Sequence, residues 1–328
     1  MIKNLKPFVT SAICAIVVGQ AWAQAPRTFT LDIEWENSVG YLDDVPDPSK
    51  LVTSPGIPTF NPRNFMRFIA IADIISVNGK PAKGTWVLGG RLVQIFRSPM
   101  PGQAIGDLAV RGSMADIHLE ILDNDGTPVG TIMTSGFTGG NAPPGLPGFC
   151  NLAVTGGTGA FQGVTGTVAS PNFSTRPTSM AEDPASRRIN GGTHGHFLAY
   201  LISTASPEIV TTSSGPAVFH ADFSPVTTGK PARSGETLIV RATGLGPTRP
   251  GLTPGTPFPD NPLLEVNSPV EVTVNGKPAD LVTKIGWPGT TDMYRLDIRI
   301  PDGTAPGTAA IQVTAAFIAG REVRIPVQ

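Results

Sequence analysis

Short runs of β-branched and aromatic residues, each ended by glycine, proline, asparagine or aspartate, recur along almost the whole chain. The chain has 38 glycines and 33 prolines among its 328 residues, and only 15% of its residues are charged. Strands favour β-branched and aromatic side chains, whereas turns favour glycine, proline and asparagine. The pattern is therefore typical of many short antiparallel strands, and we expect an all-β protein with few helices.

The first 23 residues have the features of a cleavable signal peptide. Lys3 and Lys6 precede the apolar stretch 8–18, and a small-x-small cleavage site ends at Ala23. The apolar stretch is shorter than the roughly 20 residues that a membrane-spanning helix needs. We therefore expect a secreted or periplasmic protein. Cys14 leaves lipid attachment as an alternative.

Charge and cysteine content exclude several classes of function. The formal net charge is -1 and no basic cluster stands out, so we expect no nucleic-acid partner. The glycine-rich run 156–166 continues as a strand and lacks the lysine of a phosphate-binding loop. Removal of the signal peptide leaves Cys150 alone, which excludes an intramolecular disulfide.

A segment rich in serine, threonine, glycine and proline, residues 204–216, divides the chain. We predict a barrel domain over 24–205, a linker over 206–215 and a second domain over 216–328. In the second domain, apolar and polar residues alternate over 270–275 and 294–300, and Asn275-Gly276 predicts a hairpin turn. About seven such strands are typical of an immunoglobulin-like sandwich.

The second domain also resembles a known module. The residues that carry the resemblance are Phe223-Ser224-Pro225-Val226, Ala232-Arg233-Ser234-Gly235-Glu236-Thr237 and Ala242-Thr243-Gly244-Leu245-Gly246-Pro247. They resemble the C-terminal immunoglobulin-like module of exported proteins from Acidobacteria such as Solibacter. The resemblance implies a spacer or adhesion module that contacts the cell envelope or glycans, and it brings no catalytic residues.

The first domain is predicted to be a barrel. Asn78-Gly79 and Asp125-Gly126 predict tight turns between consecutive strands. Eight or nine antiparallel strands with short links favour an up-and-down β-barrel, because closure removes the exposed edges. The predicted strands are 29–35, 65–77, 84–88, 92–96, 113–122, 127–134, 151–155, 163–168 and 194–202.

One turn in this domain is distinctive. Leu152-Ala153-Val154-Thr155-Gly156-Gly157-Thr158-Gly159-Ala160-Phe161-Gln162-Gly163 places a single aromatic within a glycine-dense turn between two strands. The glycines allow positive φ angles, and we expect Phe161 to fold under the turn as a plug. The segment resembles the turn of the allene oxide cyclase and dirigent barrels, and the resemblance covers residues 29–203.

The resemblance implies an apolar lumen that holds a hydrophobic small molecule and needs no cofactor. Allene oxide cyclases guide cyclisation of a fatty-acid epoxide, and dirigent proteins guide coupling of phenoxy radicals. A lumen wholly filled by its own side chains would contradict this interpretation. Whether the chain is an enzyme stays open: a cofactor-independent cyclase, isomerase or dirigent-like guide is one hypothesis, and a non-catalytic structural or adhesive surface protein is another.

Glu34, Arg67 and Asp73 are the candidate catalytic residues. The cyclases carry an acidic residue on their first strand, but Glu34 shares a face with two other acidic residues, as solvated faces also do. Arg67 and Asp73 lie on one face of an apolar run, which predicts either a charged pair inside the lumen or two charges at its rim. The cyclase hypothesis requires these side chains to point into the lumen.

His118, His196 and Tyr200 are the candidate ligand-binding residues. Tyr200 shares a strand face with His194 and His196 and would donate a hydrogen bond to a ligand, unless it is a core residue. We expect no metal. The alternative is chelation by His194 and His196, which needs a third ligand such as His118, whereas ordinary surface histidines would show the same pattern.

Overall fold

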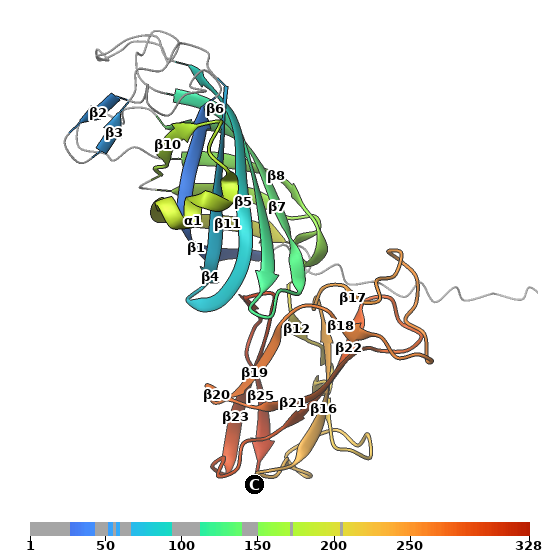
Figure 1. Cartoon of the computed structure of the whole chain (residues 1–328). Coiled ribbons are helices and arrows are strands. Elements are labelled where there is room, and N and C mark those ends of the chain that lie inside the picture. Colours follow the sequence, from blue (N-terminus) through green and yellow to red (C-terminus); the bar gives the residue numbers. More distant parts are fainter. Residues whose placement is uncertain are drawn as a thin grey trace, which may run out of the picture.

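The computed structural model describes residues 27–42, 52–54, 57–59, 67–93, 112–139, 150–170, 173–203 and 206–328. The predicted signal peptide and Cys14 lie outside these residues. Strands account for nearly all of the elements, which confirms the all-β prediction. Among the described residues, no helix has the length and apolar character to cross a membrane. Figure 1 shows a barrel with a second group of sheets against one of its ends.

The barrel has eight antiparallel strands in up-and-down order. Each strand pairs with the next in the chain, and the first strand pairs with both the second and the last, which closes the sheet. The predicted closed barrel is confirmed. Its strands are β1 (Arg27–Leu42), β4 (Arg67–Val77), β5 (Lys80–Val93), β6 (Gly112–Asp123), β7 (Pro128–Gly139), β8 (Cys150–Gly157), β9 (Thr165–Ser170) and β11 (Thr193–Ser203).

The prediction of two strands at 84–88 and 92–96 was wrong, because β5 runs unbroken from Lys80 to Val93. Gly89 and Gly90 lie within this strand and pair with Ile69 and Phe68 of β4. A Cβ on Gly90 would lie 2.6 Å from the Phe68 ring. The glycine therefore makes room for a neighbouring ring and does not start a turn.

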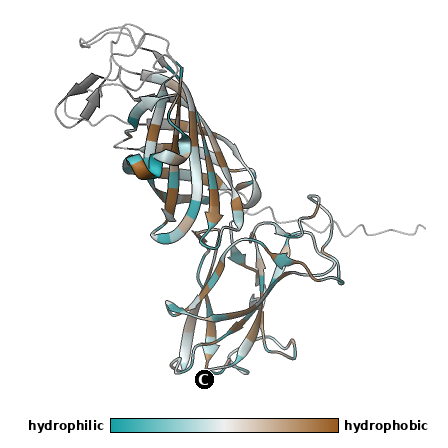
Figure 2. Ribbon diagram, in the orientation of Figure 1, coloured by the Kyte–Doolittle hydropathy of each residue, from teal (hydrophilic) through white to brown (hydrophobic). Residues whose placement is uncertain are grey.

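Alternation along the strands separates the two faces of the barrel wall, and Figure 2 shows hydrophobic and hydrophilic positions following one another along them. On β6, Ile117, Leu119 and Ile121 are fully buried, whereas the residues between them are exposed. Successive side chains of a strand point to opposite faces, so the buried set faces the lumen. The lumen core also contains residues from the other seven strands.

The glycine-dense turn has the predicted form. Residues Gly159–Phe161 form a short 3-10 turn, and Phe161 is 0% exposed, which confirms the plug. Gly159 has φ +60°, and a Cβ there would lie 2.4 Å from the carbonyl oxygen of Val129. Only glycine meets both conditions, so this position fixes the approach of the turn to β7.

The segments between β1 and β4 and between β9 and β11 contain further regular elements. In the first, β2 (Val52–Ser54) pairs with β3 (Ile57–Thr59). In the second, β10 (Arg176–Ser179) adds to β1 in parallel, and a 3-10 turn leads into α1 (Arg187–Asn190). This second segment packs on the outer face of the wall beside β1 and β4.

The second domain is built from two sheets around one apolar core. The strand β12 (Glu208–Ile209) lies within the predicted linker and joins the first sheet by pairing with β16 (Thr237–Thr243). The immunoglobulin-like assignment stays a prediction. The first sheet contains β12, β15 (Val218–Phe219), β16 (Thr237–Thr243), β17 (Thr248–Arg249), β18 (Glu265–Val266), β21 (Asp280–Gly286) and β22 (Met293–Arg299). The second contains β19 (Val270–Val274), β20 (Lys277–Pro278), β23 (Gly307–Ala315), β24 (Ile318–Ala319) and β25 (Val323–Val327), and the strands β13 (Thr211–Thr212) and β14 (Gly215–Pro216) pair apart from both. 

The second domain covers one end of the barrel. The turn between β23 and β24 places Phe317 in the barrel core, and Asn78 Nδ2 donates to the Phe317 carbonyl oxygen at 2.9 Å. Lys80 forms an ion pair with Glu271 at the same junction. The plug residue Phe161 and Phe317 therefore fill the end of the lumen that faces the second domain.

Candidate functional site

The three candidate catalytic side chains lie on the outer face of the barrel wall. Glu34 lies between Ile33 and Trp35, which are both fully buried in the lumen core. Arg67 is exposed and precedes the inward-facing Phe68. Asp73 pairs across the strands with Glu36, on the outer face. The inward orientation that the cyclase hypothesis requires is therefore not found for any of the three, and their catalytic role stays a prediction.

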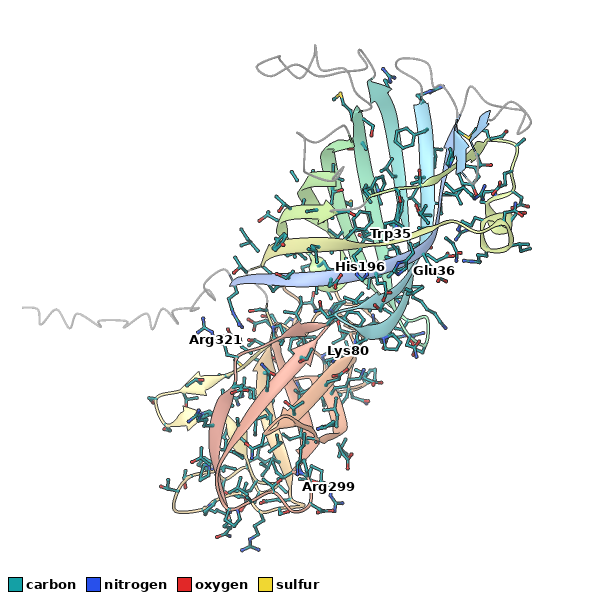
Figure 3. All side chains as sticks on the ribbon, turned by 90° about the vertical axis from the view of Figure 1, so that its left-hand side faces the viewer. Trp35, Glu36, Lys80, His196, Arg299 and Arg321 are labelled. Carbon is teal, nitrogen blue, oxygen red and sulfur yellow. The ribbon has the colours of Figure 1, made fainter. Side chains whose placement is uncertain are left out.

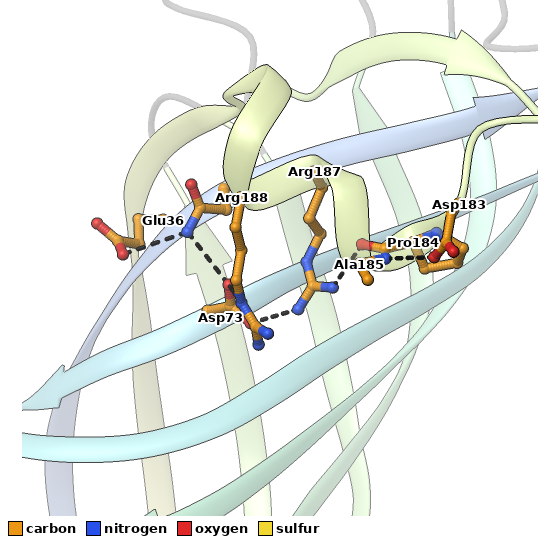
Figure 4. Close-up of polar contacts among 8 residues, drawn as sticks. Glu36, Asp73, Asp183, Pro184, Ala185, Arg187 and Arg188 are labelled. Atoms are coloured by element: carbon orange, nitrogen blue, oxygen red, sulfur yellow. Dashed lines mark hydrogen bonds and ion pairs between the residues drawn. The ribbon is translucent and has the colours of Figure 1, made fainter.

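Asp73 belongs to a buried ionic cluster beneath α1 (Figure 4). Its side chain is 12% exposed, and its carboxylate forms an ion pair with the buried guanidinium of Arg187. Arg188 donates to it through Nε at 2.9 Å and through Nη2 at 2.7 Å, and Asn37 Nδ2 donates at 3.1 Å. The partners of Asp73 are thus two arginines from a segment more than a hundred residues later in the chain, and the alternative of a charged pair with Arg67 inside the lumen is not found.

Two guanidiniums surround the single carboxylate of this cluster. Burial raises the pKa of Asp73, but the hydrogen bonds from Arg188 and Asn37 and the charge of Arg187 outweigh it, so the pKa lies below its usual value. A buried carboxylate with a guanidinium partner holds its segment in one position, because separation would leave an unpaired buried charge. The cluster thus fastens the segment that contains α1 to the barrel wall.

A second group of polar side chains lies on the outer face of β1 and β11, which run side by side in Figure 3. His194 Nε2 is 2.9 Å from Glu34 Oε1, and Ser76 Oγ donates to Glu34 Oε2 at 2.8 Å. These hydrogen bonds, with that of His194 the larger, lower the pKa of Glu34. His196 Nδ1 lies 2.9 Å from Asp32 Oδ1. The two histidine rings are 5.5 Å apart.

The remaining candidates also face outward. His118 is exposed on β6, between the buried residues Ile117 and Leu119. Tyr200 is 49% exposed and lines a shallow groove of 390 Å³ on the outer face, together with Thr28, Thr30, Thr167 and Ile202 as well as the neighbouring Phe29, Gly166 and Leu201. The structure does not bring His118 together with Tyr200 or His196, which lie on a different strand.

The lumen itself contains a cluster of four aromatic rings. Trp35 and Trp86 meet edge to face at 5.4 Å between ring centroids, and Phe197 lies 5.5 Å from Trp86. Phe173 stacks on Phe197 at 5.9 Å. Trp35, Trp86 and Phe197 are fully buried. The middle of the lumen is therefore aromatic.

Three polar atoms in this apolar lumen lack a hydrogen-bond partner: Trp35 Nε1, Trp86 Nε1 and Ser170 Oγ, each buried. Ser170 faces inward because it follows the buried Val168 at a spacing of two. We call these three residues, with Phe173 and Phe197, the lumen site. Sequence analysis missed it, although Trp35 has the same parity as the inward Leu31 and Ile33.

No protein-family model and no curated protein matches this chain. Among solved structures, a pterocarpan synthase dirigent protein is 13% identical with a TM-score of 0.30, over 61% of this chain and 96% of that chain. A pyocyanin demethylase is 18% identical with a TM-score of 0.26, over 54% of this chain and 100% of that chain. At these TM-scores neither carries an argument about function.

Proposed function

We propose that the N-terminal barrel binds a hydrophobic small molecule in its lumen. The observation that carries the proposal is the lumen site, in which two tryptophan N–H groups and one serine hydroxyl are buried without a partner. Small-molecule sites in proteins are mostly apolar and contain a few polar groups that orient the ligand. The lumen site has this composition.

The unpaired atoms also define what the ligand needs. A buried donor without a partner costs about 1–3 kcal/mol, so a ligand that accepts its hydrogen bond recovers free energy. The indole N–H only donates, so the ligand needs an acceptor oxygen on an apolar body. In this proposal the ligand enters from the end of the barrel away from the second domain, because Phe161 and Phe317 fill the other end.

The proposal includes export and kinship with the allene oxide cyclase and dirigent barrels. Support comes from the predicted cleavage site at Ala23 and from the resemblance of the turn around Phe161. Guided cyclisation or coupling is a narrower form of the same proposal. It has less support, because the outward positions of Glu34, Arg67 and Asp73 leave the lumen without the charges that it requires.

Adhesion through the second domain is a separate candidate function. The Arg241 guanidinium lies 4.7 Å from the Trp287 ring, and the neighbouring Phe223 is 53% exposed. Exposed aromatic rings beside an arginine are typical of contact surfaces. Pull-down with glycans or cell-envelope fragments, comparing the full chain with its Phe223→Ala variant, tests this candidate. Equal capture by both would count against it.

Tryptophan fluorescence tests binding in the lumen. The chain has four tryptophans, so a Trp22→Phe/Trp287→Phe variant leaves Trp35 and Trp86 as the only indoles. We expect 2-naphthoate, which has a carboxylate on an apolar body, to change this emission at lower concentration than 2-methylnaphthalene. Adding Tyr200→Phe, in the outer groove, should leave the titration unchanged. Unchanged emission with both compounds would contradict the proposal.

A further inference from the structure

Glu34, His194 and His196 converge on the outer wall of the barrel, away from the lumen site. Each offers one ligand atom, and these atoms lie within 4.8 Å of one another. The strand pairing explains the convergence. Glu34 of β1 lies opposite His196 of β11, and His194 precedes His196 by two residues, so it lies on the same face of that strand. The side chains are 31%, 54% and 45% exposed, so an ion can reach them from solvent.

Residues around this group hold two of its members in place. Asp32 contacts Nδ1 of His196 at 2.9 Å, and Ser76 donates to the second carboxylate oxygen of Glu34 at 2.8 Å. A histidine that binds a metal through one ring nitrogen commonly donates its other N–H to a carboxylate, which fixes the tautomer and the ring orientation. Asp32 and Ser76 therefore provide the outer contacts that metal ligands usually have.

We propose that Glu34, His194 and His196 bind a divalent transition-metal ion, with Zn²⁺ as the best match. Two imidazoles and one carboxylate are a ligand set that zinc uses in proteins, with the fourth position open to water or another ligand. Imidazole nitrogen also favours zinc, copper and nickel over magnesium and calcium, which prefer oxygen ligands. Among the described residues, no other group of three such side chains converges in this way.

The site spans the strands that close the barrel. His194 and His196 belong to β11, Glu34 belongs to β1, and Ser76 belongs to β4, which pairs with β1 on its other side. A bound ion would connect the first and last strands of the closed sheet. Because binding to the folded state alone stabilises that state, zinc should raise the thermal unfolding midpoint.

The chain offers a matched control. It has four histidines. His118 is exposed on the outer face of β6 and belongs to no such group, and His220 is 6% exposed and paired with Glu236. A His118→Ala variant therefore removes an exposed histidine without removing a proposed ligand.

Isothermal titration of the full chain with ZnCl₂ after chelator treatment tests the site. We expect one ion for each chain in the wild type and in His118→Ala, and no measurable binding in His194→Ala or His196→Ala. Asp32→Asn should weaken binding by about 10- to 100-fold, as loss of an outer carboxylate does. Equal binding by His118→Ala and His194→Ala, or no binding by the wild type, would overturn the proposal.

A stability measurement gives the same site a second readout. With ZnCl₂, the unfolding midpoint should rise in the wild type and in His118→Ala, and stay constant in His196→Ala. If the midpoint of His196→Ala rises as much as that of the wild type, these residues do not form the site. Neither result bears on the lumen, because the naphthoate titration uses Trp35 and Trp86 on the inner face.

Discussion

The two hydrophobic cores of the chain differ in whether the polar groups of their buried rings have hydrogen-bond partners. In the core of the second domain, Tyr294 is 7% exposed and its hydroxyl donates to the Gly246 carbonyl oxygen at 2.6 Å. In the barrel, Trp35 and Trp86 are fully buried and their N–H groups have no partner. Native cores pair most of their buried polar atoms. The second domain has exceptions too, Arg241 Nε and Ser268 Oγ. In the lumen, however, the unpaired N–H groups belong to two rings that meet edge to face, and we propose that they mark where a ligand binds.

The two faces of the barrel wall show the same contrast. On the outer face, Asp73 pairs with Arg187 and Arg188, and Glu34 pairs with His194 and Ser76. On the inner face, the polar atoms of the lumen site are unpaired. The carboxylates of the outer face are therefore paired, whereas the three polar atoms of the lumen site have no partner.

Phe161→Ala should have the largest effect on the barrel. The ring is fully buried beneath the glycine turn, and loss of a buried phenylalanine costs about 3–5 kcal/mol, here about 4 kcal/mol of unfolding free energy. Urea unfolding of the Trp22→Phe/Trp287→Phe variant, followed by fluorescence, reports on the barrel alone. Phe223→Ala, which truncates a 53% exposed ring, is the control and should change the value by less than about 0.5 kcal/mol.

Asp73→Ala should have the next largest effect, a loss of about 3 kcal/mol in unfolding free energy. The substitution leaves Arg187 buried without its carboxylate, which is the costly way to break a buried ion pair. The value lies at the lower end of the usual range because Arg188 is 60% exposed and regains water. The same urea experiment measures it, and Asp116→Ala, on the exposed face of β6, serves as the control. Equal losses for both would contradict a fastening role.

Tyr294→Phe sharpens the comparison between the two cores. It removes the hydroxyl that pairs with Gly246, and a hydrogen bond of this kind contributes about 1 kcal/mol. Circular dichroism during urea unfolding measures the loss in the second domain. Burial raises the pKa of Tyr294 to about 12, so its absorbance at alkaline pH should titrate above that of an exposed tyrosine. A normal titration would mean that the ring is not enclosed.

The pH dependence of the Asp73 cluster should be the smallest effect. The folded pKa of Asp73 lies below 3.8, the usual value for an aspartate, since its hydrogen bonds and charge partners outweigh burial. Its stabilising contribution is therefore complete above pH 3.8 and is lost as the pH falls from there through the folded pKa. The difference in unfolding free energy between the wild type and Asp73→Asn should narrow below pH 4. If this difference in unfolding free energy stayed constant down to pH 2, Asp73 would not be paired in the folded protein as described.

The barrel could largely be predicted because each of its strands has a recognisable pattern of residues within its own sequence. Local residue patterns predicted the strand 113–122, which is β6, and the glycine turn with its plug Phe161, because neither depends on a distant partner. The predicted break between 84–88 and 92–96 was wrong, because Gly90 makes room for the ring of Phe68 on another strand, and sequence spacing does not show such contacts.

The site was harder to predict because it depends on contacts between distant segments. Parity placed Arg67 and Asp73 on one face of their strand and Glu34 on one face with two other acidic residues, but only the closed sheet shows that these are outer faces. The arginines that pair with Asp73 come from a loop segment with no periodic pattern. The unpaired N–H groups of Trp35 and Trp86 are equally invisible in the sequence, because missing partners are a property of the packed lumen.

Native mass spectrometry of the full chain, as isolated, tests the central claim most directly. We predict an additional mass on the wild type and on Trp287→Phe, released on unfolding as an apolar compound with an acceptor oxygen. Trp35→Phe/Trp86→Phe keeps rings in the lumen but removes both N–H donors, so it should carry less of the compound. A bare chain mass for the wild type, or equal loading of the double variant, would contradict a ligand held by the lumen site.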